Sequence, residues 1–192
     1  LLTALEVINH FNIIGPLVIH NCDTSYRIEN FNFDQLDQKK IFGAIPYFLS
    51  EGNNWSFLKI KDQFIIEIKE KVRISNLCSV GTYYFSDAEI FYNLSLEFFK
   101  NGGSKNNNEF YIAPLYEFAI KKNYKVLPIK CSDVKLFGNC DELKNTFGVS
   151  FFELLSENDY RGHQRKTFVL DIDGTLCGSP SDGNYLSCVP IE

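Results

Sequence analysis

Two kinds of apolar segment alternate along most of this 192-residue chain. Short runs rich in aliphatic side chains, such as residues 17–23 and 125–129, predict strands. Longer runs with apolar residues every three or four positions, such as residues 88–100, predict amphipathic helices. Because strands that alternate with helices usually pack as helices on a sheet, the pattern predicts an α/β fold with a mostly parallel sheet.

Residues 55–71 carry the clearest strand signal in the chain. Apolar and polar side chains alternate on both sides of a short turn at residues 61–63, and this period of two is typical of a hairpin. Leu58 and Ile60 alternate with Phe57 and Lys59 before the turn, and the alternating residues on the returning strand are Phe64, Ile66 and Ile68.

Caps and periodicity predict four helices, including the one over residues 88–100. Asp87 is a suitable N-cap for residues 88–100, and Gly148 is a suitable stop for residues 141–147. Pro114 is tolerated in the first turn of a helix over residues 110–122. An earlier helix covers residues 3–11, and the apolar face predicted for residues 88–100 consists of Ile90, Phe91, Leu94 and Phe98.

The composition excludes several classes of protein. Hydrophobic residues make up 45% and aromatic residues 15% of the chain, which is enough for a packed core. A net charge of −5 argues against a general nucleic-acid or anionic-membrane binder, although it permits a local cationic pocket for phosphates. No apolar run is long enough for a membrane span. Six scattered cysteines without a C-x-x-C pair indicate free thiols in a reducing cytoplasm.

Asp23 closes the predicted strand over residues 17–23. A carboxylate at the carboxyl edge of a parallel sheet lies where ligands of such sheets bind. One such carboxylate can hold Mg²⁺ between phosphates, because Mg²⁺ takes hard oxygen ligands and keeps several waters. The alternative is that Asp23 only begins a turn.

Glu70 and Lys71 end the predicted hairpin. A carboxylate can accept hydrogen bonds from sugar hydroxyls, and a neighbouring ammonium can neutralise a phosphate. The alternative is an exposed charged segment of the hairpin.

These stretches occur in one order together with three others, "ISNLCSVGTYYF", "NNEFYIAPLY" and "FGNCDEL". The series resembles the sugar-phosphate nucleotidylyltransferase family, most closely its branch from capsule and surface-polysaccharide clusters. The resemblance covers roughly residues 1–148. It implies a Rossmann-like nucleotidyltransferase sandwich in which a sugar-1-phosphate oxygen attacks the α-phosphorus of an NTP and releases pyrophosphate.

The resemblance also implies roles for individual residues. Asp23 matches the family's metal-binding aspartate, which implies Mg²⁺ as the cofactor. Glu70 matches the sugar-contacting glutamate, and Lys71 matches the phosphate-contacting lysine. Gly81 matches a glycine that lets the sugar approach the backbone, and Glu109 falls in a segment that packs near the sugar pocket.

The chain departs from the family pattern at two places. No glycine-rich G-x-G-x-R-L loop precedes Asp23. Leu136 stands where many members carry a second metal-binding aspartate. Asp133 and Asp141 are both open as substitutes, since no spacing argument favours either.

The stretch "FVLDIDGTLC" near the end of the chain resembles the first motif of haloacid dehalogenase-like phosphatases. An aspartate at a strand end, Asp171, suits a nucleophile, and Asp173 suits a proton donor to the leaving oxygen. Mg²⁺ beside both carboxylates would offset their repulsion with phosphate. Gly174 allows the sharp turn, and Thr175 can hydrogen-bond the phosphate or orient an aspartate. The alternative is an ordinary strand and turn.

The predicted organisation has three parts: a nucleotidylyltransferase-like domain over residues 1–149, a linker over 150–166, and the first strand of a haloacid dehalogenase-like domain over 167–192. The chain has no Met, and no Lys or Arg follows Lys166, so we expect a fragment that is inactive alone. The expected parent makes an NDP-sugar from NTP and sugar-1-phosphate. The alternatives are a Mg²⁺-dependent phosphatase with a degenerate sugar-phosphate-binding domain, or a non-catalytic sugar-phosphate-binding protein.

Overall fold

The computed structural model describes residues 1–28, 31, 36, 41–103 and 110–148. The chain divides into two units. The first consists of Leu1–Cys22 with Tyr26–Val134, and the second consists of Asp23–Ser25 with the chain from Lys135 onward. The predictions for Glu109, for the linker and for the motif with Asp171 and Asp173 lie outside the described residues.

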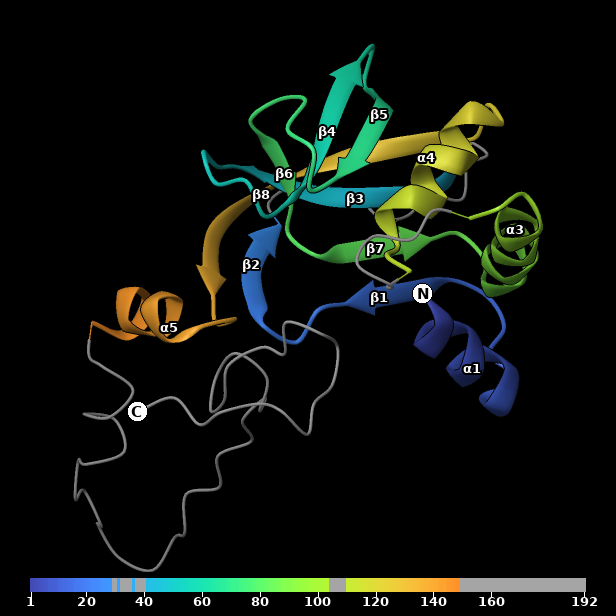
Figure 1. The fold of residues 1–192 in the computed structure, drawn as a ribbon, viewed down its shortest axis with the longest axis horizontal. Coiled ribbons are helices and arrows are strands. Elements are labelled where there is room, and N and C mark those ends of the chain that lie inside the picture. The colour runs from blue at the N-terminus through green and yellow to red at the C-terminus, as the bar shows by residue number, and fades with distance from the viewer. Residues whose placement is uncertain (29–30, 32–35, 37–40, 104–109, 149–192) are drawn as a thin grey trace, which may run out of the picture. The chain divides into compact units, whose positions relative to one another are not determined.

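An eight-stranded sheet forms the framework of the described part of the chain (Figure 1). Along the main path the strand order is β1-β7-β3-β6-β4-β5, and β8 pairs with both β3 and β2. The strands are β1 (Leu17–His20), β2 (Thr24–Ile28), β3 (Ile41–Leu49), β4 (Ser56–Lys61), β5 (Phe64–Glu70), β6 (Leu77–Ser79), β7 (Thr82–Phe85) and β8 (Lys125–Leu136).

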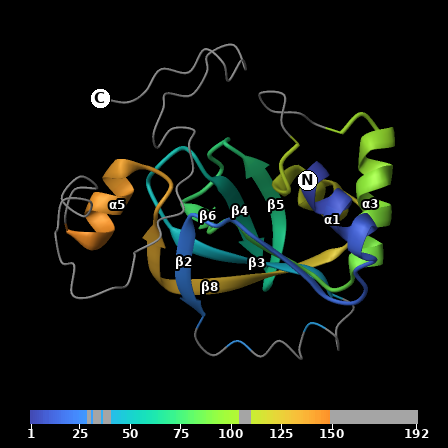
Figure 2. The same ribbon diagram turned by 90° about the horizontal axis from the view of Figure 1, so that it is seen from below.

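The expectation of a mostly parallel sheet is wrong. The pairs β1–β7, β3–β7, β3–β6, β4–β6 and β4–β5 are antiparallel, whereas β3 and β8 run parallel side by side (Figure 2). A parallel connection needs a crossover of about a dozen residues or more. The loops over residues 50–55, 62–63 and 71–76 are too short for one, so the middle of the sheet folds as antiparallel ribbons.

The hairpin over residues 55–71 is confirmed, but its returning strand contains a bulge. Asp62 and Gln63 both have positive φ, 48° and 65°, as a tight two-residue turn requires. Lys59 pairs with Glu67 and Ile60 pairs with Ile65, so Ile66 has no direct partner.

The bulge changes which side chains of β5 face the core. Because it shifts the alternation by one residue, Ile65 and Ile68 are both buried. Ile66 is 48% exposed instead of sharing the face of Ile68, as the simple period of two predicts.

The strand predicted over residues 17–23 is shorter than expected and ends at His20. Residues 77–85 run beside β3 but are interrupted at Val80 and Gly81. Gly81 has φ +77°, which extended backbone does not use, and this conformation separates β6 from β7.

The predicted helices are present, with small changes at their ends. They are α1 (Leu2–Phe11), α3 (Ala88–Lys100), α4 (Ala113–Lys121) and α5 (Cys140–Phe147). Asp87 caps α3 by accepting from two backbone N–H groups, and Pro114 lies in the first turn of α4, as expected. Ile90 is 40% exposed and so leaves the predicted apolar face of α3. None of the described helices is long and apolar enough to cross a membrane.

Apolar side chains fill both faces of the sheet in the first unit. On one face α4 packs against β5, α3 against α4, and α1 against α3 (Figure 1). The core under these helices includes Leu5, Phe42, Ile45, Leu58, Ile68, Phe85, Phe91, Leu115 and Tyr116. A smaller cluster covers the other face and consists of Leu36, Ile41, Ala44, Tyr84, Leu127 and Ile129.

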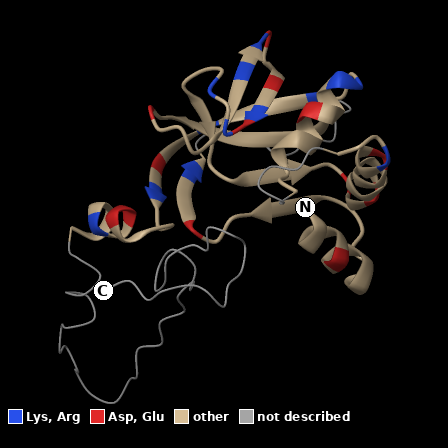
Figure 3. Ribbon diagram, in the orientation of Figure 1, with Lys and Arg blue, Asp and Glu red and all other residues tan. Residues whose placement is uncertain are grey.

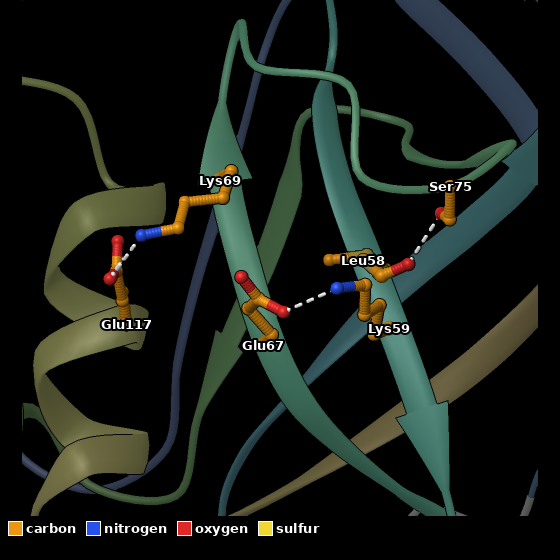
Figure 4. Close-up of polar contacts among 6 residues, drawn as sticks. All are labelled: Leu58, Lys59, Glu67, Lys69, Ser75 and Glu117. Carbon is orange, nitrogen blue, oxygen red and sulfur yellow. Dashed lines mark hydrogen bonds and ion pairs between the residues drawn. The ribbon is translucent and has the colours of Figure 1, made fainter.

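Acidic and basic residues are interspersed over β4, β5 and α4 (Figure 3). Lys59 on β4 donates to Glu67 on β5 over 2.8 Å (Figure 4). Glu117 on α4 lies 2.6 Å from Lys69 on β5 and 2.7 Å from Lys121 one helical turn away. Glu117 therefore ties the helix to the edge of the hairpin.

The second unit contains α5 and the chain that enters it. Asn139 caps the helix by accepting from the backbone N–H of Glu142, and Gly148 ends it with φ 72°, as the sequence predicts. The hydroxyl of Thr146 donates to the carbonyl of Leu136 over 3.1 Å. The helix thus holds the preceding residues 136–139 in place.

Candidate active site

Glu70 is the last residue of β5, and a buried hydroxyl orients its carboxylate. The Oγ of Ser56 on β4 donates to the Oε2 of Glu70 over 2.5 Å. The phenol of Tyr83 on β7 lies 3.2 Å from the same Oγ. Ser56 is 8% exposed and Tyr83 6% exposed, so the two hydroxyls lie in the sheet interior behind the carboxylate.

A further buried hydroxyl contacts Gly81. The backbone N–H of Gly81 donates to the Oγ of Ser79 over 3.1 Å, and Ser79 is 2% exposed. Burial raises the pKa of Tyr83 to about 12, against the lowering effect of its hydrogen bond with Ser56. The phenol therefore stays protonated and can donate at neutral pH. Two expected substrate-binding positions, Glu70 and Gly81, are therefore each held by a buried serine hydroxyl, that of Ser56 and that of Ser79.

Lys71 follows Glu70 in a left-handed backbone conformation, with φ 54°. Its backbone N–H donates to the carbonyl of Trp55 over 2.9 Å, which holds this turn. Its ammonium donates to the phenol of Tyr111 over 2.8 Å and lies 4.5 Å from the centre of that ring. Tyr111 therefore fixes the position of the exposed ammonium.

Gly81 lies against Asn21, just after β1. A Cβ on Gly81 would lie 2.5 Å from the Nδ2 of Asn21, which is closer than any side chain can approach. The backbone N–H of Asn21 donates to the carbonyl of Gly81 over 3.0 Å. Both the positive φ and the contact with Asn21 therefore require glycine here.

Asp23 belongs to the second unit and lies beside Gly138. Its backbone carbonyl accepts from the N–H of Phe137 over 2.8 Å, and its Oδ1 accepts from the hydroxyl of Thr24 over 3.3 Å. A Cβ on Gly138 would lie 3.1 Å from the Oδ2 of Asp23 and 3.2 Å from the Oε2 of Glu142. Glycine at position 138 leaves room between the two carboxylates.

The chemistry of Asp23 suits a magnesium ion that takes its other ligands from phosphates and water. Its carboxylate is exposed, and Mg²⁺ commonly takes one or two protein carboxylates and completes its shell with phosphates and water. Within the described ranges no three His, Cys, Asp or Glu side chains converge, so these residues offer no complete protein cage for a metal. The Oε2 of Glu142 accepts from the backbone N–H of Gly138, which gives it a structural role.

The two possible substitutes for the aspartate missing at position 136 differ in their contacts. Asp133 has an ion pair with Arg27, with 3.3 Å between Oδ2 and Nε. Asp141 is exposed in the first turn of α5. Asp141 belongs to the same unit as Asp23, whereas Asp133 belongs to the other.

The sequence interpretation missed the residues that hold the candidate substrate-binding residues in place. Ser56, Ser79 and Tyr83 lie on β4, β6 and β7, and strand periodicity does not single out hydroxyl side chains among apolar neighbours. All three are polar residues at buried positions, and buried polar side chains usually have hydrogen-bond partners. A polar residue within an otherwise apolar strand was therefore the sign that could have pointed to them. Their mutual contacts depend on strand pairing, which no local pattern specifies.

No protein-family model matches the chain, and no curated protein sequence matches it. Solved structures do resemble it. The nucleoside-diphosphate-sugar pyrophosphorylase from Vibrio cholerae RC9 is 28% identical, with a TM-score of 0.62, over 76% of this chain and 62% of its own. A Bacillus anthracis protein assigned as a glucose-1-phosphate thymidylyltransferase, solved with a sucrose, is 15% identical, with a TM-score of 0.58, over 85% of this chain and 63% of its own.

The α/β fold with its antiparallel-rich sheet is thus shared with sugar nucleotidyltransferases. The Vibrio protein is similar to this chain in sequence as well as in fold, whereas the Bacillus protein shares only the fold. The chain spans less than two thirds of the length of either neighbour.

Proposed function

We propose that the protein carrying this chain is a nucleotidylyltransferase that forms an NDP-sugar from an NTP and a sugar-1-phosphate. The observation that supports this most directly is that buried hydroxyls hold both Glu70 and Gly81, through Ser56 with Tyr83 and through Ser79. The sequence resemblance implies that Glu70, Lys71 and Gly81 lie around the sugar phosphate. A second support is that the fold resembles that of a nucleoside-diphosphate-sugar pyrophosphorylase.

The chemistry assigns each of these residues a separate task. A phosphate oxygen of the sugar-1-phosphate attacks the α-phosphorus of the NTP, the bond between the α-phosphorus and its bridging oxygen breaks, and pyrophosphate leaves. Glu70 accepts a hydrogen bond from a sugar hydroxyl, and Lys71 neutralises the sugar phosphate. Gly81 lets the sugar approach the backbone. Such reactions depend on in-line positioning and charge neutralisation.

Mg²⁺ is the proposed cofactor, with Asp23 as its ligand from this chain. When bound, the ion supplies positive charge to the phosphates of the NTP. Asp23 contributes a carboxylate that its Phe137 and Thr24 contacts hold in position. Glu109 is proposed to lie near the sugar pocket, on the strength of the sequence resemblance alone.

We place the reaction in surface-polysaccharide biosynthesis in the cytoplasm, where free thiols such as Cys78 and Cys131 remain reduced. Residues 167–192 are proposed to begin a haloacid dehalogenase-like module of the same pathway, with Asp171 and Asp173 as its catalytic and Mg²⁺-binding carboxylates. The sequence motif supports that module, and the proposed partners are the two small-molecule substrates.

A phosphatase is the second candidate, because Leu136 occupies the position of the family's second metal-binding aspartate. In that case the first domain would bind a sugar phosphate without transferring a nucleotide. Incubating the protein with sugar phosphates and Mg²⁺ and measuring inorganic phosphate separates this candidate from the transferase.

The transferase proposal is tested with the protein that contains this sequence. Pyrophosphate release is followed for each of the common NTPs and dNTPs with a panel of sugar-1-phosphates in the presence of Mg²⁺. We expect release with one preferred pair and none when either substrate is omitted. A folded protein that releases no pyrophosphate with any pair contradicts the proposal.

A further inference from the structure

We propose that Tyr83, acting through Ser56, is a positioning residue that fixes the carboxylate of Glu70 for recognition of a sugar hydroxyl. This inference rests on the proposed function, since it names what holds the sugar-binding carboxylate of that same site. Tyr83 itself does not touch the substrate in this proposal.

The single proton of each hydroxyl fixes the direction of both hydrogen bonds, from Tyr83 to Ser56 and from Ser56 to Glu70. A serine hydroxyl has one proton, and that of Ser56 points to the Oε2 of Glu70. The 3.2 Å contact between Ser56 and Tyr83 then requires the phenol of Tyr83 to donate. Both protons therefore point toward the carboxylate, and hydrogen bonds aligned in one direction polarise and strengthen each other.

Burial limits the movement of both hydroxyl groups. Ser56 and Tyr83 come from β4 and β7, and both are almost completely buried among packed strands, so neither hydroxyl can move far. Glu70 is only half-buried at the end of β5, where a glutamate side chain ordinarily samples several rotamers. The bond from Ser56 selects one of them and occupies Oε2.

The remaining carboxylate oxygen is then available for the sugar. Among the contacts of the described residues, none involves the Oε1 of Glu70. One oxygen is held from the protein interior, and the other is left to accept from a ligand. Without Tyr83, the hydroxyl of Ser56 loses the donor that polarises it and limits its rotation.

The kinetic test compares Tyr83→Phe with wild type in the pyrophosphate-release assay. We expect the KM for the sugar-1-phosphate to rise about tenfold, the cost of weakening one hydrogen bond to a charged group, while kcat and the KM for the NTP change less than about twofold. Ser56→Ala should give the same selective rise, and the double variant should add little to it.

Tyr116→Phe is the matched control. It removes a phenol from the same core, and that phenol donates to the backbone carbonyl of Tyr84 and not to the Glu70 network. We expect its KM for the sugar-1-phosphate to remain within about twofold of wild type. An equal change in Tyr83→Phe and Tyr116→Phe, or no change in Tyr83→Phe, would overturn the positioning role.

A second measurement needs no activity and so separates this inference from the proposed function. Thermal unfolding is measured for Tyr83→Phe, Glu70→Gln and their double variant, beside the same cycle with Tyr116→Phe. We expect the shifts in Tm to be non-additive in the first cycle and additive in the second. Additive shifts in both would overturn the network, whereas absent pyrophosphate release in wild type would overturn only the proposed function.

Discussion

Gly81 is the residue at which backbone conformation and close packing coincide. Its φ of 77° is costly for any residue with a Cβ, and Asn21 occupies the space that the Cβ would need. Gly102 has the same φ, but no atom lies within 4 Å of its Cβ position. A comparison of alanine substitutions at the two glycines therefore separates the cost of backbone strain from the cost of crowding.

We predict that Gly81→Ala lowers the free energy of unfolding by about 2–4 kcal/mol, and Gly102→Ala by about 1–2 kcal/mol. The difference is the cost of displacing Asn21. Urea denaturation of both variants measures it. Equal losses would mean that Asn21 moves aside without cost and that crowding at Gly81 is unimportant.

At the scale of elements, the bulge in β5 decides which isoleucines stabilise the hairpin. Ile68 is fully buried, whereas Ile66 is half exposed. We predict that Ile68→Ala lowers the free energy of unfolding by about 2–5 kcal/mol and that Ile66→Ala lowers it by about 1 kcal/mol or less. Chemical denaturation measures both, and similar losses would indicate a hairpin without the bulge.

The contact between α4 and β5 depends on the charge of Glu117. Burial acts to raise the pKa of this carboxyl, but hydrogen bonds from Lys121 and Lys69 outweigh it, so the pKa lies below its usual range. A folded-state pKa below the unfolded value adds stability above the unfolded pKa. That stability is lost as the pH falls through the folded pKa.

We predict that Glu117→Gln lowers the free energy of unfolding at pH 7 by about 1 kcal/mol or less, because both lysines are partly exposed to solvent. The difference from wild type should shrink as the pH falls below the usual carboxyl range. Urea denaturation from pH 7 to pH 3 measures this. Glu97→Gln, which breaks the more exposed pair with Lys122, is the control, and an equal or larger loss there would contradict the role of Glu117.

At the scale of the whole molecule, the proposed activity depends on the carboxylate of Asp23. We predict that Asp23→Ala lowers Mg²⁺-dependent pyrophosphate release at least about a hundredfold, because the metal loses its ligand from this chain. Glu6→Ala removes an exposed carboxylate from α1 and should leave turnover unchanged. Unchanged turnover in Asp23→Ala, or retained activity with excess chelator, would remove Asp23 from the metal site.

The amino-acid sequence by itself determined the type and position of most elements. The caps at Asp87 and Gly148 and the tight turn at Asp62 and Gln63 are local, and each satisfies or shapes its own backbone. The sequence also identified Glu70, Lys71 and Gly81 as candidates, through their resemblance to a known series of motifs. The motif at Asp171 and Asp173 remains a prediction from sequence.

Only the tertiary structure decided how these elements combine. The direction of the strands and the hydrogen bond between Tyr83 and Ser56 join segments that are distant in sequence, and the bulge at Ile66 depends on the register within the hairpin. Such contacts depend on which strands pair and in which register, and one residue of slip moves every side chain to the opposite face. The local periodicity of a strand does not identify a partner that is distant in sequence, so the support behind Glu70 became visible only in the folded sheet.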